Sequence, residues 1–296
     1  MTTWTGVDPA DYGLRRGEAR VGDVTLRWAE AGEGPIVLLL HGFPECWVSW
    51  RRQIDALTTA GYRVIAPDQR GYPNTSKPQG VASYHIDRLV EDVEGLRQHL
   101  GAPHIHLVGH DWGAIVAWFY AMRHDAHLQT LTIMNVPHPA HFLSMALDPE
   151  QLRMSWYILF FQLPWLPAYL LRKDGARNLR KTITVDRIPG TYERDDIALT
   201  AEAIARNGVE TLLHWYRGLL RLGPVGVRRR LQRIETPTLV LWGERDRALH
   251  KRYARPPVSW VPDQRLRYFP RASHWVQSDE STAVSEALLE HILAHP

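Results

Sequence analysis

The chain has 296 residues, of which 45% are hydrophobic and 23% are charged, a composition usual for a water-soluble globular protein. Its net charge is only +3, and no recognisable nucleic-acid-binding motif accompanies its one dense basic run, residues 228–230, so no nucleic-acid partner is expected. The longest apolar stretch, residues 156–171, is interrupted by Gln162, Pro164 and Pro167 and is shorter than the roughly 20 residues of a transmembrane helix, so no membrane span is expected.

The chain contains a single cysteine, Cys46, which excludes an internal disulfide bond and a zinc site built on cysteines. A chain without disulfides suits a reducing compartment. Residues 1–12 carry Asp8 and Asp11 and lack the apolar segment of a secretory signal. We therefore expect a cytoplasmic protein.

Predicted strands and helices alternate in the first half of the chain. Residues 24–29 alternate apolar and polar side chains, which predicts a half-buried edge strand, whereas the continuous apolar run at 36–40 is typical of a buried parallel strand. The other elements predicted here are a strand at 63–66, a helix at 86–100 closed by Gly101, a strand at 104–108, a helix at 113–123 and a strand at 131–136. This order predicts a parallel sheet with helices on both faces.

The alternation stops at Pro137. Residues 138–231 are predicted to form helices and loops, rich in Trp and Tyr, without a strand. Strands are expected again at 238–242 and 266–269, followed by a helix at 281–294. We therefore expect an α/β core domain formed by residues 1–137 and 232–296, with residues 138–231 inserted as a helical lid over the strand ends.

The clearest chemical motif lies at residues 108–114, between a predicted strand and a predicted helix, and reads VGHDWGA. In a nucleophile elbow the chain turns so sharply that small residues are needed two positions before and two positions after the nucleophile. Gly109 and Gly113 occupy these positions, and Asp111 stands where a serine hydrolase has its Ser. The alternative is an ordinary glycine-bearing turn with an Asp that has no chemical role.

The remaining members of a catalytic triad follow in the order that such a site requires, which is nucleophile, acid and then histidine. Asp246 follows the predicted strand at 238–242, and His274 follows the one at 266–269. Both lie at the edge where open α/β sheets place their sites. Glu244 comes earlier in the same loop as Asp246 and is the weaker candidate for the acid.

Three further segments resemble the α/β-hydrolase-fold epoxide hydrolases, a family related to soluble epoxide hydrolase. Residues 41–44 (HGFP) resemble the HGxP motif of that family, residues 68–72 (DQRGY) its DxRGY segment, and residues 135–139 (NVPHP) the stretch that leads into its lid. The resemblance extends from residue 26 to the last helix and departs from the family at residues 73–76, which contain no proposed catalytic group. It implies the α/β-hydrolase fold, with a mostly parallel sheet flanked by helices and an inserted helical lid.

The resemblance also implies two lid tyrosines, for which Tyr157 and Tyr216 are the candidates. Tyr157 lies where the family has its first lid tyrosine. Tyr216 lies where the family has its second, although the family often has Asn where this chain has His214. In an aromatic-rich lid either tyrosine could serve only in packing, and Tyr169 and Tyr192 are rival candidates.

These residue types together suit the conversion of an epoxide to a vicinal diol. A carboxylate that attacks an ester forms a reactive anhydride, whereas Asp111 attacking a strained epoxide carbon would form a stable alkyl ester. Tyr157 and Tyr216 would hold the epoxide oxygen and protonate it, because a phenol with an ordinary pKa of about 10 keeps its proton at neutral pH. His274, oriented by Asp246, would then activate the water that hydrolyses the ester.

Two backbone amides are expected to form an oxyanion hole, those of Phe43 and of Trp112, which follows the nucleophile. The loop should turn tightly at Pro44, with a cis peptide bond as one option and with His41 and Glu45 as structural supports. A small apolar epoxide is the expected substrate, with water as the second reactant. The residues expected to contact it are Phe43 and Trp112 of the core and Trp156, Phe160 and Trp165 of the lid. The same part of the lid also contains the apolar residues Phe161, Leu163 and Leu166. The chemistry calls for neither a metal nor an organic cofactor.

Two other functions remain open. A haloalkane dehalogenase shares the fold and the ester intermediate, and Trp112 suits a halide donor; Phe43 offers no second donor, which leaves Trp156 or Trp165 for that role. Fluoroacetate dehalogenases are also similar, but they have Arg in the place of Trp112. A function of a different class is ligand binding on a hydrolase fold, with the site kept for recognition only. A homodimer is left open as well.

Overall fold

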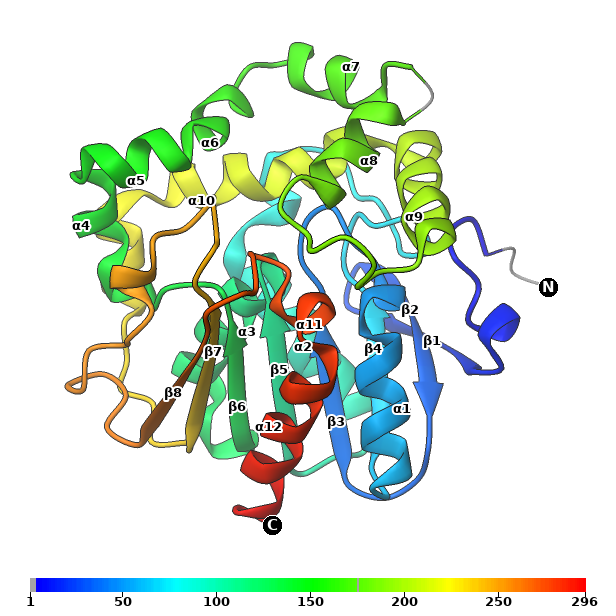
Figure 1. Cartoon of the computed structure of the whole chain (residues 1–296), viewed down its shortest axis with the longest axis vertical. Coiled ribbons are helices and arrows are strands. Elements are labelled where there is room, and N and C mark those ends of the chain that lie inside the picture. Colours follow the sequence, from blue (N-terminus) through cyan, green and yellow to red (C-terminus); the bar gives the residue numbers. More distant parts are fainter. Residues whose placement is uncertain (1–3, 175) are drawn as a thin grey trace.

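The computed structural model describes residues 4–174 and 176–296. Its centre is an eight-stranded sheet with the strand order β1-β2-β4-β3-β5-β6-β7-β8 (Figure 1). The strands are β1 (Arg15–Val21), β2 (Val24–Ala31), β3 (Ile36–Leu40), β4 (Arg63–Asp68), β5 (Ile105–His110), β6 (Leu128–Met134), β7 (Thr238–Gly243) and β8 (Gln264–Phe269). β2 pairs antiparallel with β1 and β4, and the pairs from β4 through β3 to β8 are parallel.

The central strands are apolar along their length because helices cover both faces of the sheet. Every residue of β3 and of β5 is buried, as expected for parallel strands in the middle of such a layer. One face packs against α1 (Arg51–Thr59) and α12 (Ser281–Leu293), which is preceded by the short α11 (Val276–Asp279). The other face packs against α2 (Ile86–His99) and α3 (Trp112–His124), which also contact each other.

Between β6 and β7, the described residues form helices and loops and no strand. The helices are α4 (Phe142–Ala146), α5 (Pro149–Met154), α6 (Trp156–Phe160), α7 (Leu166–Arg172), α8 (Arg177–Thr184), α9 (Arg194–Asn207) and α10 (Val209–Arg230). Figure 1 shows them as a layer across one end of the sheet, and we call this layer the helical insertion, residues 138–231. Of the helices that the structure describes, none is long and apolar enough to cross a membrane.

The predicted fold class is confirmed, and one predicted element is placed incorrectly. Residues 24–29 were expected to be an edge strand, but they lie in β2, which has β1 on one side and β4 on the other. The edge strand on this side of the sheet is β1, whose sequence RRGEARV contains four charged side chains. Its buried positions include Gly17 and Ala19, whose side chains are absent or small. The sequence of β1 therefore does not show the alternation of apolar and polar residues that would predict a strand.

Candidate active site

Asp111 stands at the sharp turn between β5 and α3. Its backbone has φ 48° and ψ −121°, a left-handed conformation that is costly for a residue other than glycine and is typical of functional positions. The two glycines predicted for the elbow are sterically required, because a side chain at either position would collide with the backbone. A Cβ at Gly109 would lie 2.5 Å from the carbonyl oxygen of Gly113, and a Cβ at Gly113 would lie 2.0 Å from that of Leu40. The turn can therefore form only with glycine on both sides of Asp111.

The carboxylate of Asp111 is held from two directions. Oδ1 accepts a hydrogen bond of 2.6 Å from the backbone N–H of Phe43, and Oδ2 lies 3.4 Å from Nε2 of His274. Burial favours the neutral acid, but His274 and the Phe43 amide outweigh it and lower the pKa of Asp111. The position at the start of α3 also favours a negative charge. Asp111 is thus ionised at neutral pH.

His274 lies between two carboxylates, in the loop between β8 and α11. Its Nδ1 is 2.8 Å from Oδ2 of Asp246, and its Nε2 faces Asp111. Burial by itself lowers the pKa of an imidazole, but the two negative charges raise the pKa of His274 well above its ordinary value. In the resting protein His274 is therefore a cation that pairs with both acids. The structure brings Asp111, Asp246 and His274 together in the geometry of a triad.

Asp246, in the loop after β7, is the acid that faces His274, whereas Glu244 forms an ion pair with Lys251. Oδ2 of Asp246 also accepts a hydrogen bond of 2.8 Å from Nδ2 of Asn135. Its other oxygen, Oδ1, accepts from the backbone N–H groups of Ala248 and Leu249 at 2.7 and 2.9 Å. The sequence analysis gave Asn135 no role of its own. Its position directly after β6, at the same edge of the sheet, could have indicated that it lies near Asp246.

A second group of buried polar side chains, which begins at His110, is hydrogen-bonded to the backbone of His274. His110 donates from Nε2 to the carbonyl oxygen of His274 at 2.8 Å, and its Nδ1 is 3.1 Å from Nε2 of Gln277. Gln277 also donates to Oε2 of Glu45, which forms a buried ion pair with Arg187 of the helical insertion. Burial opposes ionisation of Glu45, but Arg187 and His110 hold its pKa below the ordinary value. The loop of residues 41–45, the triad and the helical insertion are therefore joined by one polar network.

The two predicted tyrosines lie side by side over this site. Tyr157 on α6 and Tyr216 on α10 have ring centroids 6.1 Å apart. Burial raises the pKa of each phenol, and the negative charge of Asp111 raises it further, so both phenols stay protonated. The rivals are placed differently: Tyr169 is 52% exposed, and Tyr192 packs against Arg187.

The apolar residues expected to contact substrate divide into two groups. Phe43 and Trp112 are buried, and both pack against Tyr216, with ring centroids 5.4 and 4.9 Å away. Phe160 is half-buried, in contact with its buried neighbour Phe161. The rings of Trp156 and Trp165, by contrast, are 61% and 69% exposed.

Phe161 is the aromatic residue of the helical insertion that lies closest to the tyrosine pair. Its ring packs against Phe43, Tyr157 and Tyr216, with centroid distances of 5.7, 5.7 and 4.9 Å. The sequence indicated only that it belongs to an apolar part of the lid. Short helices give no reliable apolar period, so the inward-facing side chain could not be distinguished there from its exposed neighbours.

One of the two amides expected to form the oxyanion hole, that of Phe43, already forms a hydrogen bond with Asp111. The Phe43 amide already points at Oδ1 of Asp111, and the peptide bond between Phe43 and Pro44 is cis. Trp112 follows Asp111 as the first residue of α3, so its backbone N–H is one of those without a partner inside the helix.

Comparisons with known proteins agree with this geometry. Residues 35–281 match the family described as alpha/beta hydrolase fold. The chain is 38% identical to the AB hydrolase superfamily protein YfhM of Bacillus subtilis, over 91% of this chain and 94% of that protein. It is 33% identical to epoxide hydrolase 3 of Xenopus tropicalis, over 94% of this chain and 78% of that protein. Among solved structures, an epoxide hydrolase of Bacillus megaterium bound to an inhibitor superposes with a TM-score of 0.86, at 29% identity, over 94% of this chain and 100% of that one.

Proposed function

Because this chain belongs to the epoxide hydrolases of the α/β-hydrolase family, we propose that it converts an apolar epoxide to a vicinal diol through a covalent ester on Asp111. One observation carries the proposal: an ionised carboxylate in a nucleophile elbow, with two protonated phenols near it, one half-buried (Tyr157) and one buried (Tyr216), and a His–Asp pair beside it. The carboxylate suits attack at an sp3 carbon, and the phenols suit a leaving oxygen that needs a proton.

In the first step, Oδ2 of Asp111 attacks one carbon of the epoxide and the ring C–O bond breaks. The oxygen leaves as an alkoxide and takes a proton from Tyr157 or Tyr216, while the second phenol donates a hydrogen bond to it. Oδ1 stays bound to the Phe43 amide and becomes the carbonyl oxygen of the ester. The raised pKa of each phenol keeps its proton available until an alkoxide, a stronger base, has formed.

Before the second step, the proton of resting His274 passes to the phenolate left by the first step, which restores the phenol and frees the imidazole. His274 then removes a proton from water, and the resulting hydroxide attacks the carbonyl carbon of the ester. Negative charge develops on Oδ1, where the amides of Phe43 and Trp112 stabilise it. The bond between the carbonyl carbon and Oδ2 then breaks, and the leaving oxygen of the diol takes the proton that His274 removed from water. The new carboxylic acid of Asp111 gives its proton to His274, so both groups return to their resting forms. Asp246, which accepts four hydrogen bonds, keeps the imidazole oriented and stabilises the imidazolium that forms.

The electrostatics predict that the two steps depend differently on pH. Formation of the ester removes the charge of Asp111, one of the two charges that raise the pKa of His274, so this pKa should fall and free the imidazole to act as a base. Alkylation needs only ionised Asp111, whose pKa is lowered. Between about pH 4 and pH 6, bounded by the ordinary pKa values of Asp and His, alkylation should continue while hydrolysis slows. Rapid-quench mass measurements should then show accumulated ester, and equal pH dependence of both steps would contradict the scheme.

The alternative of a haloalkane dehalogenase receives less support. A halide leaves as a stable anion and needs N–H donors rather than an acid. Trp112 offers one such donor, but the rings of Trp156 and Trp165 are largely exposed and are poorly placed to provide a second. A protein that only binds ligands would have no need of an imidazole held between two carboxylates or of the strained backbone at Asp111.

The proposal is tested by product analysis with styrene oxide, a terminal alkyl epoxide and a 1-haloalkane. We expect diol from at least one epoxide, no halide release, and no diol from an Asp111→Ala variant. Halide release without diol would favour the dehalogenase, and no turnover of any of the three would favour the binding protein. We propose a small apolar substrate because the buried side chains beside the tyrosines are aromatic. A cytoplasmic location stays a prediction from the sequence, as does a homodimer.

A further inference from the structure

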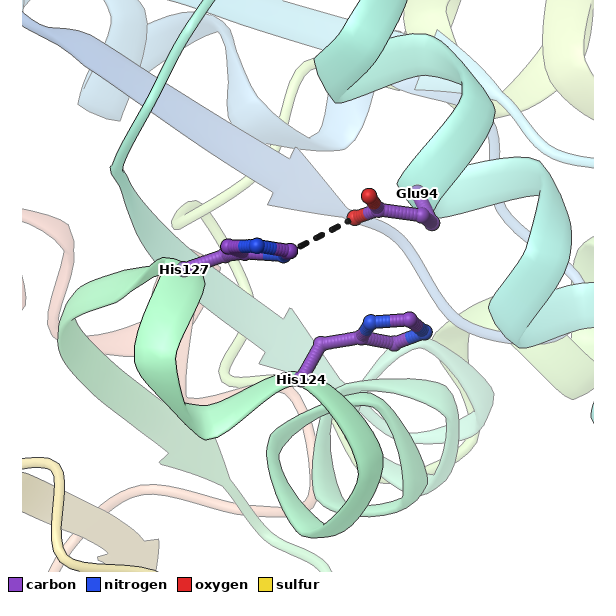
Figure 2. A group of neighbouring side chains, drawn as sticks. All are labelled: Glu94, His124 and His127. Atoms are coloured by element: carbon purple, nitrogen blue, oxygen red, sulfur yellow. Dashed lines mark ion pairs between the residues drawn. The ribbon is translucent and has the colours of Figure 1, made fainter.

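A group of metal-ligating side chains lies outside the active site, where α2 packs against the end of α3. Glu94 comes from α2, His124 is the last residue of α3, and His127 belongs to the 3-10 helix η4 (Asp125–His127) that follows it. Each residue offers one ligand atom, and these atoms all lie within 4.8 Å of one another. Figure 2 shows the two imidazole rings and the carboxylate gathered around one space between the helices.

The backbone determines this arrangement. α3 ends at His124, whose backbone has φ −131° and ψ 34°, and η4 follows at once and carries His127 as its last residue, so the two histidines lie close together. Their rings are nearly parallel, at 17°, with centroids 5.8 Å apart, and the His124 ring also stacks on Tyr120. Glu94 faces them because α2 and α3 are in contact. Glu94 and His124 are thus carried by helices that pack against the sheet, and His127 by the short η4 that follows α3.

The protonation states of the cluster suit metal binding. Burial lowers the pKa of His124, which leaves this imidazole neutral at pH 7 with a free lone pair. Nδ1 of His127 is buried, has no hydrogen-bond partner among the described residues, and lies 3.5 Å from Oε2 of Glu94. Burial opposes ionisation of Glu94, but hydrogen bonds from Arg97, Tyr120 and other donors hold its pKa at about 2, so the carboxylate is ionised.

We propose that Glu94, His124 and His127 bind one divalent transition-metal ion of the zinc type through two imidazole nitrogens and one carboxylate oxygen. Zinc binds such ligands at about 2.0–2.2 Å, and a tetrahedral ion keeps an open position for water when three protein ligands are present. The ligand atoms must move closer together than they now are. The His127 side chain is 38% exposed, so its imidazole can rotate toward the other two ligands.

The surroundings of Glu94 determine which ions the site selects. Arg97 donates to both carboxylate oxygens, at 2.6 and 2.9 Å, and so offsets the negative charge that a hard cation would need. The imidazoles then dominate the binding, which favours zinc, nickel or copper over magnesium or calcium. The hydroxyl of Tyr120 and the amide of Gln98 each donate to Glu94 at 2.8 Å and orient it, as outer partners of metal ligands commonly do.

The site lies far from the reaction that we propose. Asp111 precedes the first residue of α3 and His124 is its last, and a helix of 13 residues is about 20 Å long. The metal would join α2 to the end of α3 and would take no part in catalysis. Zinc should therefore raise the melting temperature, because it binds the folded chain through residues of two helices, and epoxide turnover should not require it.

The test is a titration of the metal-free full chain with zinc chloride, in competition with a chromophoric zinc chelator. We expect the wild type to bind one zinc ion and to show a higher melting temperature with zinc. A His124→Gln/His127→Gln variant should bind zinc at least about tenfold more weakly, because even the loss of a residue that only hydrogen-bonds to a metal ligand typically has an effect of this size. Zinc should no longer raise the melting temperature of this variant. The matched control is His99→Gln/His104→Gln, which removes two exposed histidines and should behave as the wild type.

Two results would overturn the proposal. The first is equal zinc affinity of the double variant and the control, which would assign the binding to other histidines. The second is an anomalous-diffraction peak of zinc-soaked wild-type crystals at a place other than this cluster, a measurement that does not depend on how the variant folds. Tight binding of magnesium or calcium would contradict the predicted selectivity. Unchanged epoxide turnover by the double variant would show that it is folded.

Discussion

A His274→Gln variant should form the covalent ester and then stop. Alkylation uses Asp111 and the phenols, so it should proceed, whereas hydrolysis lacks its base and should slow by about 10²- to 10⁴-fold, the usual contribution of general-base catalysis. Glutamine retains a hydrogen-bonding side chain, but it cannot accept a proton from water at neutral pH. Intact-protein mass spectrometry after mixing with an epoxide should therefore show the protein mass plus one substrate.

The control for this experiment is His104→Gln, which changes an exposed histidine and should leave turnover and mass unchanged. Digestion of the trapped variant should place the added mass on the peptide that contains Asp111. Steady turnover by His274→Gln near the wild-type rate would mean that another group activates the water. Added mass on a different peptide would mean that Asp111 is not the nucleophile.

A Tyr157→Phe/Tyr216→Phe variant should be nearly unable to open epoxides. An alkoxide is a poor leaving group unless it is protonated, and each phenol contributes general-acid assistance or a hydrogen bond, together typically worth about 10²- to 10⁴-fold. Either single change should slow alkylation less than the double change does, because the remaining phenol can partly replace the missing one. Packing should be preserved, since each substitution removes only a hydroxyl group. Rapid-quench measurement of the alkylation rate gives the result.

Two controls separate acid catalysis from packing. Tyr169→Phe removes the hydroxyl of an exposed tyrosine in the same insertion and should have no effect. Breakdown of a preformed ester should persist in the double variant, because that step depends on His274 and Asp246. An unchanged alkylation rate in the double variant would reduce both tyrosines to packing residues and would favour the dehalogenase alternative.

The grouping of Asp111, Asp246 and His274 could be predicted from the sequence because each of them lies in the segment that follows a predicted strand. β5, β7 and β8 run parallel in one sheet, with β6 between β5 and β7, so the residues after them meet at one edge. The glycines of the elbow added a steric requirement that the structure confirms at Gly109 and Gly113. These inferences need only local patterns and the parallel arrangement of the sheet.

Features that depend on long-range packing were not predictable in this way. The sequence indicated Glu45 as a structural support but gave it no partner, and Arg187, which is 142 positions away, does not differ in the sequence from an ordinary surface charge. The exposure of Trp156 and Trp165 depends on how short helices sit on the core, for which their sequences give no period. The approach of Glu94 to His124 and His127 likewise requires the packing of α2 on α3.

The covalent role of Asp111 is tested most directly by one turnover in water labelled with oxygen-18, using the protein in excess over styrene oxide. If Asp111 attacks the epoxide, the diol takes its new oxygen from the carboxylate, and labelled water replaces that oxygen during hydrolysis. The account predicts an unlabelled diol and oxygen-18 in the peptide that contains Asp111. A labelled diol with an unlabelled Asp111 peptide would show direct attack by water and would contradict the ester mechanism.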